Sequence, residues 1–453
     1  MAAGQDRPRR HRRGTADIDR NRRRFGAARP RPNGDAADLN PALADALRGA
    51  ARRFGTPLYL YDLSRLRADA RAVREAFPDP WIRLYSLKAN GLPGLVREIA
   101  AEGFALSAVS GGELALGARA GVDPGRIVLE GVGKTDRDLS AAARMAAAGT
   151  PPLWVSLESA EDAAALAAEV VRAGSRVDAL VRVNPQVAPE TLGALAVGAP
   201  SSKFGVLPEE LPAVIEAGGG PDGAIRWRGI HLHVGSQLGA VDAWRSAFRV
   251  GLRLLELQKA ELTDFDTLDA GGGFPVAYDG DVESVPAPAV FAAAAQAELE
   301  QLPAAARPRR LAVEPGRAVV AGCGWLIGRV LHVRRREPPI VVLDTGMTEL
   351  IRPALYGAVH PMVALTSLGQ PANNAAPGAL VRVDGPICES TDTLGSAALP
   401  PLERGDLVAI GMAGAYGSSM FSTYNGRPRP AEVAWDSDGL RLLGRRGSVT
   451  SLP

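Results

Sequence analysis

Cysteine is scarce in this sequence, and long apolar runs are missing from it. Its 453 residues contain two cysteines, Cys323 and Cys388, which are too few for a disulfide framework or a cysteine-based zinc site. We therefore expect both to be free thiols. No stretch approaches the roughly 18 apolar residues that a membrane-spanning helix requires. These absences argue against a disulfide-stabilised small domain and against a helical membrane protein.

The start of the chain carries an unbalanced charge. The formal net charge is +2, yet arginines cluster in residues 1–33 and the rest of the chain is acidic. Because no aromatic or amphipathic pattern accompanies this charge, we interpret residues 1–38 as a disordered extension or as a start assigned too early. An arm that binds nucleic acid or membranes is the alternative. The paired arginines lack the apolar stretch of an export signal, so we expect a cytoplasmic protein.

Repeated strand–helix units organise the middle of the chain. Apolar residues make up 46% and charged residues 23% of the sequence, as in globular proteins, and its length favours two unequal domains. From residue 82 onward, short β-branched runs alternate with alanine-rich segments of helical period. The expected strands lie near 82–87, 105–110, 126–131, 153–158, 178–184, 228–235, 265–270 and 309–314. These units predict an α/β fold with a (β/α)8 TIM-type barrel over residues 62–317, and a doubly wound open sheet is the alternative.

The pattern changes after residue 317, where short strands and turns replace the helical alanine runs. This predicts a C-terminal β-rich domain over residues 318–453. Its expected strands lie near 325–334, 339–344, 380–383, 406–410 and 441–443. The segment 39–61 ends in a strand-like run, so we expect it to join the β domain. Residues 194–203 and 367–379 are predicted to be loops.

One lysine stands at the carboxyl end of the first barrel strand, the end at which such barrels build their active sites. We expect burial to lower the pKa of Lys88, which would make its amine a nucleophile for a Schiff base. A solvated, structural lysine is the alternative. Further polar or glycine residues end later strands, namely Arg182, Asn184, His231, His233, Ser236, Gly271, Gly272, Gly273, Glu314, Gly316 and Arg317.

Two histidines end the sixth strand. We place His231 and His233 on opposite faces of that strand and therefore expect them to be poor joint metal ligands. One is expected to pack within the structure and the other to face the barrel mouth. We predict no metal site.

A candidate anion site follows the seventh strand. Three consecutive glycines, 271–273, leave backbone N–H groups free to approach a phosphate, and Ser236 and Arg317 add a hydroxyl and a guanidinium. A simple turn is the alternative. Glu314 is costly at the end of a buried strand unless it pairs with a cation, and a protonated ring nitrogen would serve. The run 130–135 suggests a phosphate-binding P-loop, but Val128 stands where that motif requires glycine, so we reject this interpretation.

A nucleophilic lysine, a phosphate cradle, a carboxylate for a pyridinium nitrogen and a histidine that can lie on an aromatic ring together indicate a pyridoxal 5'-phosphate site. The sequence resembles the fold-type III pyridoxal-phosphate decarboxylases, and among them the diaminopimelate decarboxylases, over roughly residues 40–435. The matching stretches are Tyr85–Asn90, Ser110–Leu114, His231–Gln237, Glu314–Arg317, Leu350–Tyr356, Gly385–Ser390, Gly414–Gly417 and Tyr424–Glu432. The resemblance implies an alanine racemase-like two-domain architecture.

The resemblance also implies roles for individual residues. Lys88 would bind the cofactor as a Schiff base, His233 would stack on its ring, and Glu314 would keep the ring nitrogen protonated. The remaining cofactor-binding residues would be Arg182, Ser236, Gly271, Gly272, Gly273, Gly316, Arg317 and Tyr416. Substrate binding is implied for Arg317, Arg352, Tyr356, Glu389 and Tyr416.

The family pattern further implies a homodimer with shared active sites. Cys388 and Glu389 would reach the site from the second subunit, where Cys388 would protonate the carbanion left after loss of carbon dioxide. A small buried residue is the alternative for a single cysteine.

The implied reaction is decarboxylation of meso-2,6-diaminopimelate to L-lysine. Arg352, Glu389 and Tyr356 suit a second amino-acid head group, which needs partners for a carboxylate and an ammonium. The alternatives are a related decarboxylase that acts on another amino acid in a natural-product pathway, a racemase of related fold, and a non-catalytic regulatory homologue. Homologues of the last kind lose the lysine or the cysteine, and this chain has both.

The sequence departs from the family pattern at two places. Ser107 stands where the family often has an acidic residue, which removes one charge near the lysine and the histidine. Residues 192–195 differ from the His-Pro-Tyr-Ile-type stretch that many diaminopimelate enzymes carry ahead of Lys203-Phe204-Gly205. We expect the first departure to affect catalytic tuning and the variable 192–199 loop to affect substrate specificity.

Overall fold

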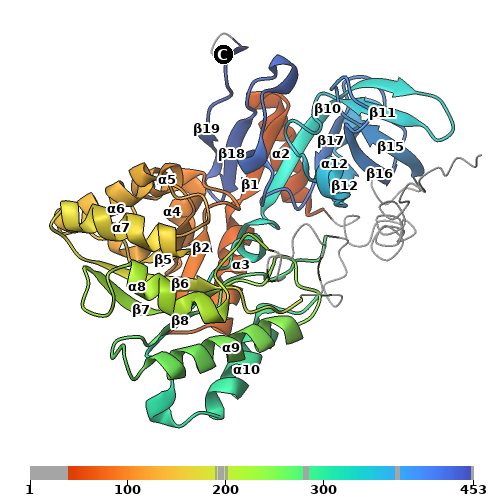
Figure 1. Cartoon of the computed structure of the whole chain (residues 1–453). Helices are drawn as coiled ribbons and strands as arrows, with labels where there is room; N and C mark the ends of the chain where they lie inside the picture. The colour runs from red at the N-terminus through yellow and green to blue at the C-terminus, as the bar shows by residue number, and fades with distance from the viewer. Residues whose placement is uncertain are drawn as a thin grey trace, which may run out of the picture.

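The computed structural model describes residues 39–188, 191, 198, 202–278, 285–372 and 378–449. Within them the chain forms a barrel of strands and helices with a sheet-rich domain beside it (Figure 1). The Arg-rich extension predicted over residues 1–38 lies outside the described residues, as does most of the 192–199 loop.

The barrel strands are all parallel to their neighbours and follow one another in sequence order. They are β2 (Ile82–Ser86), β3 (Ala105–Ala108), β4 (Ile127–Leu129), β5 (Val155–Leu157), β6 (Val177–Val183), β7 (Ile225–Leu232), β8 (Thr267–Asp269) and β9 (Arg310–Val313). Pairing of β2 with β9 closes the barrel. The predicted eight-stranded barrel is therefore confirmed, and the open sheet is excluded.

Helices surround the barrel. They are α3 (Leu63–Ala76), α4 (Pro93–Ala101), α5 (Gly111–Arg119), α6 (Asp136–Ala147), α7 (Ala160–Arg172), α8 (Leu211–Ala217), α9 (Asp242–Gln258), α10 (Pro288–Glu300) and α11 (Arg317–Val320). All of them except α9 and α11 begin at polar capping residues or prolines. The Ser-Gly-Gly-Glu motif is the start of α5. There the Glu113 N–H donates to Ser110 Oγ, and the Glu113 carboxylate accepts from the Val109 N–H. That motif thus fixes where α5 leaves the barrel mouth.

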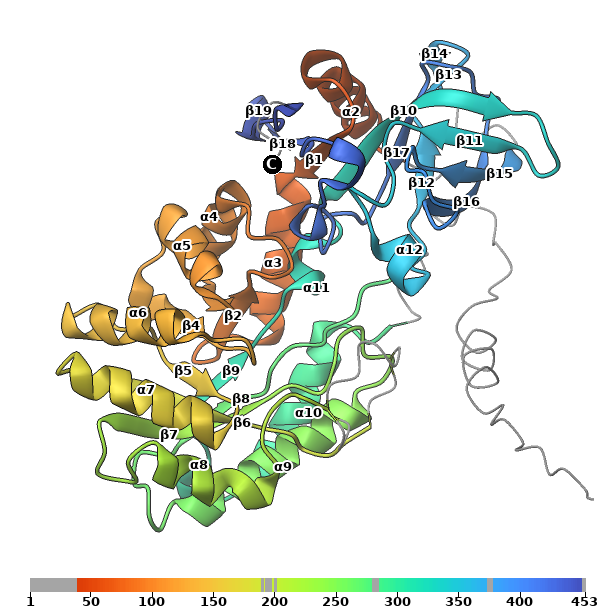
Figure 2. The same ribbon diagram turned by 45° about the horizontal axis from the view of Figure 1, so that its top comes forward.

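Within the described residues, the second domain consists of a mixed β-sheet, a separate two-stranded sheet and two α-helices. Its elements are α2 (Pro41–Phe54), β1 (Leu58–Asp62), β10 (Gly324–Arg334), β11 (Ile340–Leu343), α12 (Arg352–Tyr356), β12 (Met362–Ala364), β13 (Thr366–Ser367), β14 (Gln370–Pro371), β15 (Ala379–Asp384), β16 (Thr393–Leu399), β17 (Leu407–Ile410), β18 (Ala431–Asp436) and β19 (Gly439–Gly444). β13 and β14 form the two-stranded sheet. β1 lies between β10 and β18, antiparallel to the first and parallel to the second. The segment 39–61 thus contributes α2 and β1 to this sheet. Figure 2 shows α12 on the side of the β domain that faces the barrel.

The barrel interior has an apolar floor and a polar upper layer. The floor consists of Leu84, Ala105, Val128, Trp154, Leu180 and Ala312, all buried. Because side chains alternate along a strand, the residues two positions further on face the same interior. Those residues include Ser107, Glu130, Arg182 and Glu314, and each is buried. Polar groups therefore gather at the carboxyl ends of the strands, above closely packed apolar side chains.

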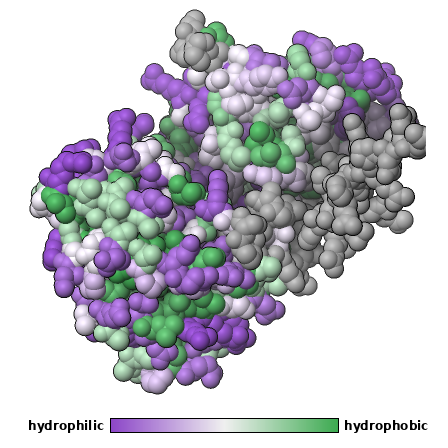
Figure 3. Space-filling view, viewed as in Figure 1, coloured by the Kyte–Doolittle hydropathy of each residue, from purple (hydrophilic) through white to green (hydrophobic). Residues whose placement is uncertain are grey.

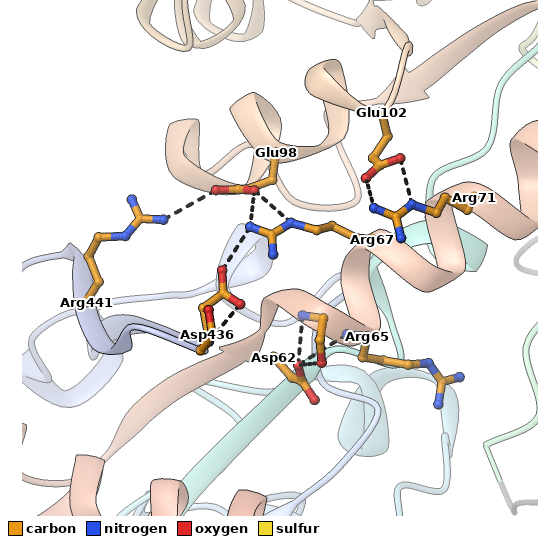
Figure 4. A network of polar contacts seen from close by, with 10 residues as sticks. Asp62, Arg65, Arg67, Arg71, Glu98, Glu102, Asp436 and Arg441 are labelled. Atoms are coloured by element: carbon orange, nitrogen blue, oxygen red, sulfur yellow. Dashed lines mark hydrogen bonds and ion pairs between the residues drawn. The ribbon is translucent and has the colours of Figure 1, made fainter.

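Ion pairs fasten the barrel to the β domain (Figure 4). Arg67 on α3 lies between Glu98 on α4 and Asp436 at the end of β18, at 2.7 and 2.9 Å. Arg441 on β19 reaches the same Glu98 at 3.4 Å. The network joins α3 and α4, on the barrel, to β18 and β19 of the β domain, so it ties segments from the two ends of the described chain together.

The face of the molecule seen in Figure 3 has a mixed surface. Figure 3 shows hydrophilic and hydrophobic residues interspersed over the face that it presents. Of the helices in the described part of the chain, none is long and apolar enough to cross a membrane.

Candidate active site

Lys88 lies in the turn that follows β2, at the mouth of the barrel. The turn is fixed from both domains, because the Leu87 N–H donates to the Ser107 carbonyl and the Tyr416 N–H donates to the Ala89 carbonyl. The Lys88 Nζ lies 3.8 Å from Glu130 Oε1, and 37% of its side chain is exposed. The expected lowering of the Lys88 pKa is wrong for this structure. Burial acts to lower that pKa, but the carboxylates of Glu130 and Glu314 outweigh it and raise the pKa above its ordinary value.

His231 and His233, at the end of β7, the sixth strand of the barrel, both face the site. Their predicted placement on opposite faces of that strand is therefore wrong. Residues two apart on a strand share a face, and only the residue between them, Leu232, points away. His231 Nε2 lies 3.4 Å from Glu314 Oε1, and His233 Nδ1 lies 3.9 Å from Glu314 Oε2. Burial lowers the pKa of His231 to about 4 and that of His233 well below its ordinary value. Both rings are therefore neutral near pH 7.

Acidic side chains of the polar upper layer lie close to Lys88. Glu314 is 3% exposed, and within the described residues its Oε1 accepts no hydrogen bond. Burial and the charge of Glu314 raise the pKa of Glu130 to about 7. Glu130, His231 and Glu314 each place a ligand atom within 4.8 Å of the other two. Such a buried cluster of acceptors favours a cationic partner.

Arg182 also faces this interior but is already paired. Its Nη1 donates to Glu158 Oε1 at 3.0 Å, and its guanidinium lies over the Phe204 ring, 5.0 Å from the centroid. The Glu158 carboxylate in turn accepts from the Gly205 N–H. Arg182 therefore anchors the Lys203-Phe204-Gly205 stretch to the barrel wall.

The three glycines after β8 leave room that a side chain would fill. A Cβ at Gly271, where φ is +68°, would lie 2.1 Å from the Leu232 carbonyl oxygen. One at Gly272 would lie 2.3 Å from the Glu314 carbonyl oxygen, and one at Gly273 would lie 2.7 Å from that of Gly235. The backbone must come this close to its neighbours, so each position requires glycine. The run is thus a compact backbone cradle rather than a simple exposed turn.

Two adjoining cavities open above this cradle. The inner one is lined by Ser86, Lys88, His233, Ser236, Gly273, Phe274, Glu314, Gly316, Arg317 and Tyr416. The outer one is lined by Ser236, Gln237, Tyr278, Arg317, Arg352, Tyr356, Ala358, Val359, Tyr416 and Met420. Three residues belong to both cavities, so the outer cavity leads directly to Lys88. The structure thus brings most of the predicted site residues together.

Two buried arginines point into this space. Arg317 donates to the Tyr278 hydroxyl at 2.6 Å and to Ser236 Oγ at 3.1 Å, and its guanidinium lies over the Tyr416 ring, 4.8 Å from the centroid. Arg352 packs over the Tyr278 ring at 4.4 Å and lies 2.8 Å from His360 Nε2. The exposed fractions are 6% for Arg317 and 5% for Arg352, and within the described residues their side chains bond to Tyr278, Ser236 and His360, none of which is acidic. Tyr278 and His360 stand in no sequence motif and were therefore not predicted as site residues.

Cys388 and Glu389 stand apart from these cavities. Both are exposed on the loop between β15 and β16, and neither lines the inner or the outer cavity. Glu389 accepts a hydrogen bond from the Tyr424 hydroxyl at 2.7 Å. Cys388 is a free thiol, as is the buried Cys323, which confirms the prediction for both cysteines. Within one chain, these two residues therefore do not complete the site.

Comparison with known proteins decides the family. The profile of the family described as "Pyridoxal-dependent decarboxylase, pyridoxal binding domain" matches residues 63–321, which is the barrel with α11. The chain belongs to the pyridoxal-dependent decarboxylases. The diaminopimelate decarboxylase of Deinococcus radiodurans is 39% identical to this decarboxylase over 405 residues, covering 88% of this chain and 96% of the relative.

Solved structures support the same assignment. The crystal structure of diaminopimelate decarboxylase from Helicobacter pylori complexed with L-lysine aligns with a TM-score of 0.80 at 29% identity, covering 89% of this chain and 97% of that one. The lysine/ornithine decarboxylase of Vibrio vulnificus complexed with putrescine aligns with a TM-score of 0.73 at 26% identity, covering 87% and 99%. Both the fold and the barrel-plus-sheet organisation are shared.

The residues of this decarboxylase fit pyridoxal phosphate. Glu314 Oε1, buried and without a donor in the described chain, suits a protonated ring nitrogen. The backbone cradle at 271–273, next to Ser236 and Arg317, suits the phosphate group. The inner cavity is lined by Lys88 together with Glu314, Ser236, Gly273 and Arg317.

Proposed function

We propose that this decarboxylase converts meso-2,6-diaminopimelate to L-lysine and carbon dioxide. The observation that carries the proposal is the pair of buried guanidiniums, Arg317 and Arg352, whose side-chain partners within the described residues are not carboxylates. Burying an unpaired charge is costly, so such a site is built for anionic ligands. The cofactor phosphate accounts for one of them. The second guanidinium then fits a carboxylate at the far end of the substrate.

The cofactor would be held by residues from several barrel strands. Lys88 would bind it covalently, His233 would lie against its ring, and Glu314 would keep its ring nitrogen protonated. Its phosphate would meet Ser236, Gly271 to Gly273, Arg317 and Tyr416. Bound there, pyridoxal phosphate supplies an electron sink for the charge that develops at Cα. The neutral state of the His233 ring suits stacking on an aromatic surface.

The substrate would occupy the outer cavity. Arg352 sits on its wall beside Tyr356, in the direction away from Lys88 that a long substrate must take. A carboxylate placed there would receive charge-assisted hydrogen bonds that a simple diamino acid, having one carboxylate, would not need. The relatives support this choice, because the Deinococcus protein is a diaminopimelate decarboxylase and the Helicobacter structure holds L-lysine.

The proposal includes a homodimer with shared sites. Cys388 and Glu389 would enter the site of the partner, where Cys388 would deliver a proton to the substrate Cα and Glu389 would receive the substrate ammonium. Their exposure on one loop, away from the cavities of their own chain, supports this arrangement. Leu355 and Val359, which are 53% and 67% exposed beside the outer cavity, add apolar surface suited to burial against a second subunit.

The substrate test compares amino acids of one and two carboxylates. Purified full-length protein loaded with pyridoxal phosphate is incubated with meso-diaminopimelate, L-lysine or L-ornithine, and the product amines are separated and quantified. L-Lysine should form from meso-diaminopimelate, with little turnover of the other two. Arg352→Ala should lose at least about 30-fold in kcat/KM for meso-diaminopimelate, because an unpaired carboxylate costs about 2 kcal/mol or more. Preferred turnover of L-lysine or L-ornithine would refute the proposal and favour the Vibrio-type activity.

The dimer test uses two inactive variants. Lys88→Ala and Cys388→Ala each lack one essential group in every site of their homodimers. A mixed dimer carries both lesions in one site and leaves the other intact, so mixing should restore up to about half of the activity per dimer. If exchange of differently tagged subunits is demonstrated and no activity returns, each chain must hold its own complete site.

A further inference from the structure

A buried carboxylate beneath Lys88 has no role in the proposal above. Glu130 follows β4 and is 2% exposed. Its Oε1 accepts a hydrogen bond from Ser107 Oγ at 2.5 Å and lies 3.8 Å from Lys88 Nζ. Its Oε2 lies 3.5 Å from His231 Nε2 and accepts no hydrogen bond within the described residues.

Within the described residues, Glu130 forms ion-pair contacts with one group that is cationic near pH 7, while burial and the neighbouring Glu314 raise its own pKa to about 7. A buried carboxylate is costly unless a cation faces it. In the described part of the chain its ion-pair contacts are Lys88 and His231, and His231 is neutral near pH 7 because burial lowers its pKa to about 4. Arg182, the next cation, is already paired with Glu158 at 3.0 Å. Lys88 is therefore the group whose charge Glu130 meets.

The position of Glu130 also explains what stands at residue 107. β3 and β4 are neighbouring parallel strands, with Ser107 in register with Val128, so Glu130 comes two residues after the position that faces Ser107. The longer glutamate side chain reaches back until its carboxylate meets the serine hydroxyl. The carboxylate has room because residue 107 is small.

We propose that Glu130 is a positioning residue for Lys88, supplying from β4 the negative charge that Ser107 does not provide from β3. The proposal rests on Lys88 as the cofactor-bearing residue. The Ser107 hydroxyl fixes the carboxylate by donating to Oε1, and the carboxylate holds a proton on the nitrogen of Lys88, whether as the free amine or in its link to the cofactor. Glu130, which follows the adjacent strand β4, thus replaces the negative charge near Lys88 that Ser107 cannot supply.

Other groups act on the Lys88 nitrogen as well, and the experiment must separate them. Glu113 and Glu314 add negative charge, Arg182 and His233 oppose it, and Tyr416 lies close by. None of these side chains is substituted in the variants at 107 and 130. Because Glu314 and Glu130 influence each other's ionisation, the exchange variant, which keeps the number of carboxylates, is the comparison that isolates the Ser107–Glu130 pair.

The test is a pH titration of the visible absorption of the loaded protein, which follows the protonation of the nitrogen that joins Lys88 to the cofactor. Glu130→Gln keeps the shape and removes the charge, and it should lower the midpoint by about 1 to 3 pH units, the usual effect of one close opposite charge. Ser107→Asp should raise the midpoint, because it adds a second carboxylate. The exchange Ser107→Asp/Glu130→Ser should return it to the wild-type value.

Glu298→Gln is the matched control. Glu298 is a buried glutamate on α10 that pairs with Arg245 and Arg249 on the outer layer of the barrel, so its loss should leave the midpoint unchanged. An unshifted midpoint in folded Glu130→Gln would overturn the proposal. If Glu130→Gln does not fold, the exchange variant decides: a midpoint as high as that of Ser107→Asp alone would show that Glu130 contributed nothing. Failure of the proposed reaction would instead appear in wild-type protein, as no lysine from meso-diaminopimelate.

Discussion

Removal of the His360 side chain should specifically weaken substrate binding. His360 is not among the residues that line the two cavities, and it contacts Arg352, with its Nε2 2.8 Å from Arg352 Nη1 and its Nδ1 3.0 Å from the Gly411 carbonyl oxygen. The carbonyl can only accept, so Nδ1 carries the hydrogen and Nε2 is left to accept from Arg352. Burial and the charge of Arg352 lower the pKa of His360 to about 3, which keeps the ring neutral throughout the working pH range.

The size of the effect follows from this geometry. A hydrogen bond to a charged group contributes about 1.5–3 kcal/mol, and the buried Arg352 would lose it without gaining water. His360→Ala should therefore raise KM for meso-diaminopimelate by about 10- to 150-fold, with a smaller change in kcat. The ring also packs edge-on against Tyr278, 5.1 Å between centroids, so the alanine variant frees that side chain too.

Steady-state kinetics with the loaded protein measures the prediction. His360→Gln places an amide oxygen near the position of Nε2 and should recover part of the lost affinity. His332→Ala, at an exposed histidine on β10, is the matched control and should behave like wild type. A KM for His360→Ala within about twofold of the wild-type value would refute the view that this histidine orients Arg352.

Three further predictions concern other parts of the structure. Gly272→Ala should weaken the binding of pyridoxal phosphate by about 1–3 kcal/mol, because its Cβ would lie 2.3 Å from a backbone oxygen. Gly133→Ala is the control and should not weaken binding, because its Cβ would meet nothing within 4 Å. Titration of each variant with the cofactor, followed by absorbance, distinguishes the two. Arg67→Ala should lower the free energy of unfolding by about 1 kcal/mol, since it breaks two partly exposed ion pairs, and denaturant unfolding tests this. Burial raises the pKa of Asp69 from 3.8 to about 6, although the charge of Arg65 acts to lower it. The stability that protonated Asp69 contributes is therefore fully present below pH 3.8 and is lost as the pH rises through 6. Between pH 4 and pH 7, the Tm of Asp69→Asn should fall less than the Tm of the wild-type protein.

The barrel could be predicted from sequence because its signals are local. Each strand is a short β-branched run, and chemistry-bearing residues such as Lys88 and Glu314 stand where those runs end. Helix α2 and strand β18 escaped prediction, since their pairing partners are distant in sequence and supply the apolar faces that fix them. His231 and His233 were wrongly predicted to lie on opposite faces of their strand, because residues two positions apart share a face and only adjacent residues alternate.

The site was predictable only where a residue carries its own motif. Lys88, Glu314 and the glycine run all do, and the structure brings them to one cavity. Glu130 and His360 do not, because their importance comes from what they touch across the fold. The same reason explains the wrong direction for the Lys88 pKa, since burial could be inferred from the strand but the two opposing carboxylates could not.

The place of β1 in the sheet determines when, during synthesis of the chain, this strand can pair. β1 is among the first elements of the chain, yet it lies between β10 and β18, so neither neighbour exists when it leaves the ribosome. The barrel, whose strands pair in sequence order, can close while β1 waits unpaired. An unpaired apolar strand invites association with other chains. The last strands of the chain therefore act as the closing step of synthesis, and truncation within β18 should yield a formed barrel with an exposed, aggregation-prone strand.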